Sequence, residues 1–242
     1  MEITKELAEK VLHVVDHGLV AGLGQPIPGQ MCVEAAVCYA MGLPHSDRPP
    51  CVDPRLGHLK IQLNDSRIWT SHKTRAKGLR RLAIAQLGTR DCLDIHGFLD
   101  LVLEHVVKNI VPHAVSDELF TKMGFSKALC EYFDLGDTEP FTKGVVGIGD
   151  SLSYLFLSES TIVSAIQSLG ATINVEHPLV KIEYLLSPVL SLIHYNQTIN
   201  YDGPLLDVVN GREKLLSEFC EAVVQILVKM ETPGSKFLYL TE

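Results

Sequence analysis

The sequence predicts a mainly α-helical protein, folded as a compact multi-helix array within a single domain. Apolar residues recur at steps of three and four residues through most of the chain, which is the spacing of one helical face. Short segments rich in glycine and proline separate these periodic stretches. With 242 residues, of which 46% are hydrophobic, the chain has enough apolar material to bury a sizeable core.

The first third of the chain carries the clearest helix boundaries. A helix is expected within residues 3–21, and the loop GLGQPIPGQ leads from it to a second helix over residues 31–41. Asp53 before Pro54 has the pattern of an N-cap followed by proline at the first helical position. A third helix should therefore begin there.

Residues 72–87 have the most regular amphipathic pattern. At about 100° per residue, one side of this helix is apolar and the other side is basic. The apolar side consists of Ala76, Leu79, Leu82, Ala83 and Leu87, and the basic side consists of Lys73, Lys77, Arg80 and Arg81.

Helical periodicity continues in the rest of the chain, with two exceptions. Residues 141–157 and 236–240 have the β-branched and aromatic content of strands, and they would form at most a minor β-hairpin. A cluster of Gly, Asp and Pro at 134–147 is the candidate boundary if the domain has two subdomains. The remaining helices are expected at residues 93–110, 115–122, 126–134, 158–169, 178–195 and 211–230.

Composition restricts the class of protein. The net charge of −8 disfavours a protein that covers nucleic acid or anionic membrane with its whole surface. No run approaches the roughly 18 apolar residues that span a bilayer, and the N-terminus lacks the pattern of a secretion signal. We therefore expect a soluble, cytoplasmic protein that does not enter a membrane and whose six cysteines stay reduced.

Reactive side chains are concentrated in residues 29–54. On a helix, Cys32 and Cys38 point in different directions and would chelate one metal poorly, and the CxxC spacing of structural zinc sites is absent. We therefore expect no metal and no cofactor. A shared site would require the loop after the helix to fold back and bring together Cys38, His45, Asp47 and Cys51.

Cys32 is the candidate nucleophile. It begins a helix, whose positive end lowers the pKa of a thiol, and Gln30 or Gln25 just upstream is a candidate oxyanion donor. The arrangement resembles the start of papain-like and bacteriocin-processing peptidase folds over about 15 residues, and this implies a cysteine-dependent hydrolase or acyltransferase. Such an enzyme needs a histidine base, yet the downstream histidines fall mostly in segments expected to be helical. The alternative is that Cys32 packs in the core, as free cysteines usually do.

The loop HSDRP, residues 45–49, has two interpretations. Its side chains bind a ligand if they face a cleft shared with Cys32, whereas otherwise they cap backbone amides and hold a proline-rich loop in one shape. The binding candidates in this part of the chain are Gln30, Glu34, His45 and Asp47.

Four strings in the first third of the chain resemble those of bacterial proteins of unassigned function. They are MCVEAAV, PHSDRPPC, LND and GLRRLAIAQLGT, within about residues 18–89. The resemblance implies no activity, but it implies that this third is a recurring module.

Residues 60–90 contain eight basic residues and one acidic residue, Asp65. Such asymmetry marks an anionic ligand, a nucleic acid or an acidic partner, unless acidic helices of the same protein neutralise it. No helix-turn-helix, zinc-finger or RNA-recognition pattern accompanies these charges. The binding candidates in this segment are Trp69, Lys73, Lys77, Arg80 and Arg81.

The leading hypothesis is an interaction or ligand-binding protein without chemistry of its own. It would contact a protein or a small anionic ligand through the HSDRP loop or the basic helix, as a monomer or an oligomer. The first alternative is a cysteine-dependent hydrolase or acyltransferase with Cys32 as nucleophile, which needs a reactive thiol beside a histidine. The second is a nucleic-acid binder that uses residues 67–90, which needs a continuous exposed basic face.

Overall fold

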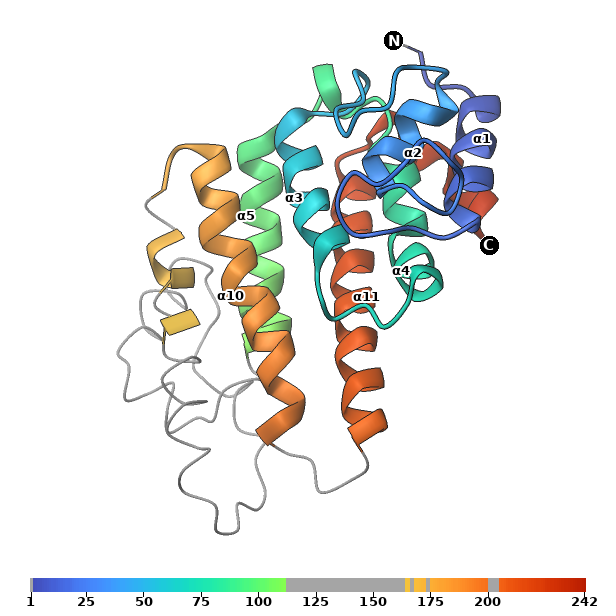
Figure 1. Cartoon of the computed structure of the whole chain (residues 1–242). Helices are drawn as coiled ribbons and strands as arrows, with labels where there is room; N and C mark the ends of the chain where they lie inside the picture. Colours follow the sequence, from blue (N-terminus) through green and yellow to red (C-terminus); the bar gives the residue numbers. More distant parts are fainter. Residues whose placement is uncertain (1, 112–163, 166–167, 173–174, 200–204) are drawn as a thin grey trace. The chain divides into compact units, whose positions relative to one another are not determined.

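The computed structural model describes residues 2–111, 164–165, 168–172, 175–199 and 205–242. These residues are mainly α-helical, which confirms the expected fold class (Figure 1). Their β pairing is limited to a single bridge between Gly24 and Met31. The expected helices at 115–122 and 126–134, the expected strand at 141–157 and the candidate boundary at 134–147 lie outside the described residues.

The chain divides into two compact units. Unit 1 comprises Met1–Phe98 and Glu213–Glu242, and unit 2 comprises Leu99–Arg212. Unit 1 holds 15 acidic and 15 basic residues, whereas residues 99–212 hold 14 acidic and 6 basic residues. The net charge of −8 therefore belongs to unit 2, and the basic excess of residues 60–90 is balanced within unit 1.

The first four helices of unit 1 follow the sequence prediction. They are α1 (Lys5–Asp16), α2 (Val33–Ala40), α3 (Pro54–Asp65) and α4 (His72–Ala85). Each of these helices follows an N-cap residue whose side chain accepts a hydrogen bond from a backbone N–H of the first turn. The first N–H groups of a helix have no acceptor within the helix, so the cap supplies one. The N-cap residues are Thr4, Cys32, Asp53 and Ser71.

The core of unit 1 is formed by the apolar faces of these helices and by the C-terminal segment. Helix α1 packs against α2 and α4, and α2 packs against α3. The apolar side predicted for α4, from Ala76 to Leu87, is buried as expected. The part of α11 (Leu205–Lys229) that belongs to unit 1 adds Leu216, Phe219, Val223 and Leu227 to this core.

The prediction of a strand at residues 236–240 is wrong. The segment lies in a 3₁₀ helix, η4 (Pro233–Thr241), which packs on α4. Thr232 Oγ1 donates to the carbonyl of Ala85 and Gly234 N donates to that of Leu87, each at 2.8 Å. A Cβ atom on Gly234 would lie 2.0 Å from the carbonyl oxygen of Ile84, so only glycine permits this approach. Tertiary contacts with α4 thus override the local strand propensity.

Unit 2 is described in part. It contains most of α5 (Ile95–His105), a π-helical turn η2 (Val106–Ile110) and α10 (Pro178–Ile199), whose buried apolar residues include Val102, Val106, Leu185 and Val189. The helix expected at residues 158–169 lies largely outside the described residues, and residues 168–172 are helical, so Gly170 does not end a helix there. Lys181 Nζ lies 2.5 Å from Asp100 Oδ1. None of the described helices is both long and apolar enough to cross a membrane.

Candidate functional site

The core of unit 1 contains a cluster of polar side chains contributed by three helices. Glu34 comes from α2, Lys60 from α3 and Gln86 from the C-cap of α4, and all three residues are 0% exposed. Lys60 Nζ lies 3.0 Å from Glu34 Oε1. Burial raises the pKa of Glu34 and lowers the pKa of Lys60, and the charge of each partner partly opposes the shift of the other. We call these three residues the buried cluster.

Three cysteines lie near the buried cluster. Burial raises the pKa of the Cys32 thiol to about 11 and that of Cys38 to about 12, and it also raises the pKa of Cys51. The charge of Glu34 raises all three pKa values further, and Cys38 is close enough to Cys51 to be affected by it. The loop after α2 therefore folds back over the helix. Within the described ranges, no three His, Cys, Asp or Glu side chains are arranged to hold a metal ion.

Cys32 lacks the surroundings of a reactive thiolate. It is 3% exposed, and its Sγ accepts a hydrogen bond from Ala35 N at 3.4 Å as the N-cap of α2. The next amide, Val33 N, donates to Asn64 Oδ1 at 3.2 Å. No histidine is among the groups that shift the Cys32 pKa. These features favour the packing interpretation of Cys32 over the hydrolase hypothesis, which requires an accessible thiolate beside a base.

The HSDRP loop is held by local and tertiary hydrogen bonds. Arg48 N donates to Ser46 Oγ at 3.2 Å, which is a capping contact of the predicted kind. His45 Nε2 lies 3.1 Å from the carbonyl oxygen of Gly24, so it ties this loop to the loop between α1 and α2. Asp47 is half-buried, and its charge raises the pKa values of Glu34 and Cys32.

Residues 20–31 of the loop between α1 and α2 are mostly exposed and carry no charge. No Asp, Glu, Lys or Arg occurs from Gly18 to Val33. Leu23 is 41% exposed and Ile27 is 50% exposed. Figure 1 shows this segment, in dark blue, crossing in front of α2. We call residues 20–31 the uncharged loop.

Side chains from α3 fix the shape of the uncharged loop. Asp65 Oδ1 accepts from Gly22 N at 2.7 Å, and Asn64 Nδ2 donates to the carbonyl of Val20 at 2.8 Å. Within the loop, Gln25 N donates to the carbonyl of Gln30 at 2.6 Å. Gln30 itself is exposed and supports the loop through its backbone. Hydrogen bonds therefore hold the backbone of the uncharged loop, although the side chains of Leu23 and Ile27 face solvent.

Arg75 is a structural residue that the sequence interpretation missed. It is buried, its Nε donates to the carbonyl of Asn64 at 2.7 Å and its Nη1 donates to that of Leu19 at 3.1 Å. It therefore joins the C-terminal end of α3 to the start of the uncharged loop. Its position beside Leu79 and Leu82 on the helical wheel is the sequence signal that separates Arg75 from the exposed basic side.

The basic side of α4 is largely neutralised by unit 1 itself. Arg80 Nε lies 2.7 Å from Asp16 Oδ1, Arg81 Nε lies 3.0 Å from Glu221 Oε2, and Lys73 Nζ donates to the carbonyl of Asp16 at 3.0 Å. Lys77 is exposed. This arrangement matches the internal-pairing alternative and provides little of the free basic face that a nucleic-acid binder needs.

Trp69 has a core role in this structure. It is 5% exposed, its Nε1 donates to the carbonyl of Leu63 at 2.8 Å, and its ring packs against Gly78 so closely that a Cβ there would lie 2.2 Å from it. The ring is therefore not available to stack on a ligand.

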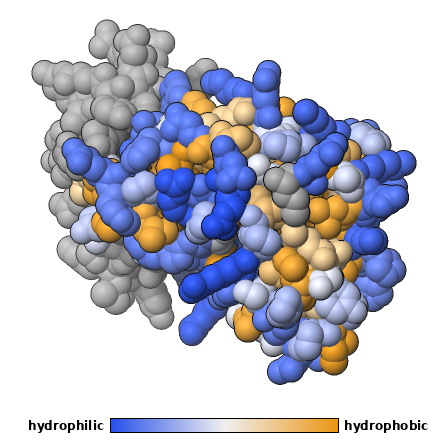
Figure 2. Space-filling model, turned by 90° about the horizontal axis from the view of Figure 1, so that it is seen from above, coloured by the Kyte–Doolittle hydropathy of each residue, from blue (hydrophilic) through white to orange (hydrophobic). Residues whose placement is uncertain are grey.

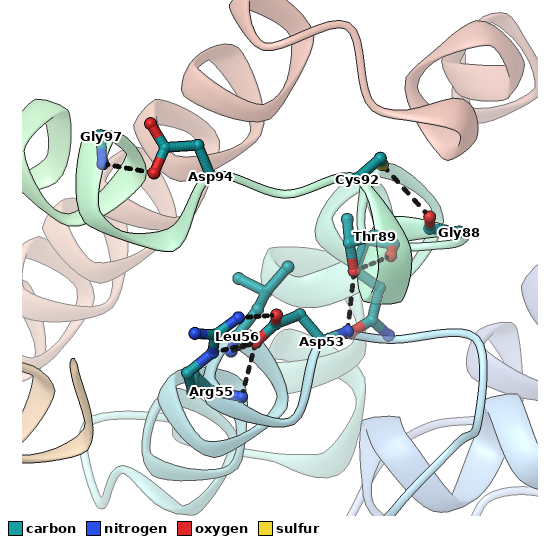
Figure 3. A network of polar contacts seen from close by, with 9 residues as sticks. Asp53, Arg55, Leu56, Gly88, Thr89, Cys92, Asp94 and Gly97 are labelled. Atoms are coloured by element: carbon teal, nitrogen blue, oxygen red, sulfur yellow. Dashed lines mark hydrogen bonds and ion pairs between the residues drawn. The ribbon is translucent and has the colours of Figure 1, made fainter.

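A network of polar contacts links the start of α3 to the residues that follow α4, next to Gln86 in the sequence (Figure 3). The carboxylate of Asp53, at the start of α3, accepts a hydrogen bond from Arg55 Nη2 at 2.5 Å. The backbone N of Asp53 donates to Thr89 Oγ1 at 3.0 Å. Thr89 begins the short helix η1 (Thr89–Asp91), and its hydroxyl donates to the carbonyl of Gln86 at 2.7 Å. The start of α3 and the end of α4 are held together by this chain of contacts.

An open groove of about 450 Å³ lies between α1 and α2. Val14 and Ala40 provide part of its apolar lining, and Tyr39 borders it while 43% exposed. Charges of both signs, from Glu6, Glu9 and Lys10, also line it, as does His13.

Comparison with known proteins assigns no family. No family model, no curated protein and no solved structure matches this chain.

Proposed function

We propose that the protein is an interaction protein without chemistry of its own, and that the uncharged loop is its contact surface for a protein partner. One observation carries the proposal: Leu23 and Ile27 stand in solvent on a loop whose backbone is tied to α3 and to His45. Exposed apolar side chains contribute no hydrophobic free energy to the stability of unit 1. A partner that buries these side chains would gain their hydrophobic free energy.

A loop whose backbone is already held by hydrogen bonds is suited to binding, because ordering a flexible loop on association costs conformational entropy and lowers the affinity. Asp65, Asn64 and His45 have already fixed the backbone of the uncharged loop, so this cost falls in the folding of unit 1. Pro26 and Pro28 on either side of Ile27 restrict the backbone further. The loop therefore presents Ile27 in a preorganised position.

The absence of charge indicates the chemistry of the partner. Charged residues are depleted at the centre of protein interfaces, and desolvating them is expensive. The segment from Gly18 to Val33 avoids this cost, so the complementary surface is an uncharged, apolar pocket on another protein. Apolar side chains also reach the surface between hydrophilic ones in the view from above (Figure 2). The basic helix supports a contact surface less well, because Arg80 and Arg81 are engaged within unit 1.

Site-specific photo-crosslinking tests the proposal. A benzoylphenylalanine residue is placed at position 27 and, as a matched control, at Tyr239, an aromatic residue on η4 that is 55% exposed. We expect a protein to crosslink to position 27 in the native cells and not to position 239. The purified partner should then bind the Ile27→Ser variant at least about tenfold more weakly, since one buried Ile side chain contributes about 1.5–3 kcal/mol. The Tyr239→Ser variant should bind as the wild type does.

Three results would contradict the proposal. Equal crosslinking at both positions means that the loop has no specific contact. Unchanged affinity of Ile27→Ser for the crosslinked protein means that Ile27 is not buried on binding. Cosedimentation with phosphatidylcholine and phosphatidylglycerol vesicles that is lost in Ile27→Ser means that the loop contacts a lipid surface.

A further inference from the structure

Five polar atoms of the buried cluster make no hydrogen bond of good geometry within the protein. They are both carboxylate oxygens of Glu34, the Nζ of Lys60, and the Oε1 and Nε2 of Gln86. Glu34 nevertheless contacts both of its neighbours, because Lys60 Nζ lies 3.0 Å from Oε1 and polar contacts from the side chains of Lys60 and Gln86 lower the pKa of Glu34. All three residues are 0% exposed, so bulk solvent does not satisfy these atoms.

Unsatisfied atoms of this kind are costly. A buried polar group without a partner costs about 1–3 kcal/mol, and a charged group costs more. The ammonium group of Lys60 has three donors and Glu34 as its ion-pair partner, so its unsatisfied donors would remove a noticeable share of the roughly 5–15 kcal/mol by which a domain is stable. The neighbouring thiols of Cys32 and Cys51 have raised pKa values, so they are protonated, and a thiol is only a weak donor.

The chemistry of the cluster restricts what completes it. An anion would face the carboxylate of Glu34, and a metal cation would face the ammonium group of Lys60. The missing partner has to donate to Glu34 and Gln86 Oε1 and accept from Lys60 and Gln86 Nε2. A small, uncharged molecule that both donates and accepts meets these demands, and buried waters typically make about three hydrogen bonds to such groups.

We propose that Glu34, Lys60 and Gln86 form an internal hydration site, in which a slowly exchanging water bridges α2, α3 and the end of α4. The water accepts from the ammonium group or the amide, and it donates to the carboxylate. The Asp53 and Thr89 contacts keep Gln86 at the site, because Thr89 Oγ1 donates to the Gln86 carbonyl. The site is independent of the uncharged loop, so it goes beyond the proposed function.

Water-to-protein cross-relaxation in the NMR spectrum of the full, ¹⁵N-labelled chain tests this site. The probe is the side-chain amide of Gln86, and the matched control in the same spectrum is Gln225, whose Nε2 donates to Glu221 at 2.7 Å on the exposed side of α11. We expect the Gln86 amide to show the cross-relaxation sign of a water that stays longer than the tumbling time. The Gln225 amide should show the sign of rapidly exchanging surface water. Absence of a long-lived water signal at Gln86 overturns the proposal.

A second measurement separates this water from other internal waters. The amplitude of the water ¹⁷O relaxation dispersion counts the long-lived waters of the protein. It should fall by about one in Gln86→Leu and stay unchanged in Gln225→Leu. An equal amplitude in wild type and a folded Gln86→Leu variant overturns the assignment to this cluster. If Gln86→Leu does not fold, the cross-relaxation of the wild type decides alone.

Discussion

Unit 1 contains ion pairs of similar length in two different environments. Glu34 and Lys60 are 3.0 Å apart with both side chains 0% exposed. Arg80 and Asp16 are 2.7 Å apart, and Arg81 and Glu221 are 3.0 Å apart, with side chains 26–48% exposed. Distance alone therefore does not distinguish the buried pair from the surface pairs.

The difference lies in what happens when one partner is absent. At the surface, water replaces the lost partner, so an exposed pair contributes about 0–1 kcal/mol. In the core, the remaining charge has no solvent, and breaking a buried pair costs about 3–5 kcal/mol. Replacing both members by apolar residues of similar volume removes the charge and the desolvation cost together. The following predictions test this contrast.

Removing one member of the buried pair should have the largest effect on stability. Lys60→Met and Glu34→Gln should each lower the free energy of unfolding by about 3–5 kcal/mol, because each leaves an unpaired charge in the core. Urea unfolding followed by circular dichroism measures this change. The double variant Glu34→Leu/Lys60→Met should recover most of the loss. A double variant as unstable as the sum of the two single variants would show that the pair is not the source of the effect.

The two single variants should also depend on pH in opposite directions. In Glu34→Gln, burial lowers the pKa of Lys60 from 10.5, so the folded state binds fewer protons than the unfolded state below pH 10.5 and above the lowered pKa. The free energy of unfolding should therefore rise with pH across this window, by up to about 1.4 kcal/mol per pH unit.

In Lys60→Met, burial raises the pKa of Glu34 from 4.5, so the folded state binds more protons between pH 4.5 and the raised pKa. The free energy of unfolding should therefore fall as the pH rises through this window. In the wild type, Glu34 and Lys60 together hold one proton at intermediate pH, both in the folded and in the unfolded state. The free energy of unfolding of the wild type should therefore change less with pH. Slopes of the same sign in the two variants would contradict a charge effect.

The cysteines should divide into protected and accessible groups. Cys92 is exposed, whereas Cys32 is buried and its pKa is raised to about 11. At pH 8, iodoacetamide should modify Cys32 at least about tenfold more slowly than Cys92, because Cys32 is buried and little thiolate is present there. Peptide mass spectrometry of the native protein measures both rates. Faster modification of Cys32 than of Cys92 would restore the hydrolase hypothesis.

Removing a surface pair should have the smallest effect. Arg81→Met and Arg80→Met should each change the free energy of unfolding by less than about 1 kcal/mol, and 1 M NaCl should reduce the difference further. Lys77→Met, at an exposed position on the same side of α4, is the matched control and should have almost no effect. A loss from Arg81→Met as large as that from Lys60→Met would remove the distinction between the two environments.

Local patterns accounted for helices α1 to α4 of unit 1 and only in part for the candidate sites. The cap at Asp53 and the apolar side of α4 depend on neighbours within one or two turns, which periodicity and cap residues reveal. The pattern of basic residues placed Lys60 and Arg80 in one segment, although one is buried and the other is at the surface. The periodicity of the sequence does not show with which distant side chain a charged residue pairs.

The sequence by itself determined helices α1 to α4, the first residues of α3 and α4, and the lack of charge in the uncharged loop, because these properties depend on neighbouring residues. The tertiary structure decided that Lys60 meets Glu34 in the core and that Arg81 meets Glu221, 140 residues away. It also decided that residues 233–241 form a 3₁₀ helix on α4 instead of a strand. The physical reason is that pKa values, ion pairing and the close approach at Gly234 depend on burial, and burial arises only when distant segments pack together.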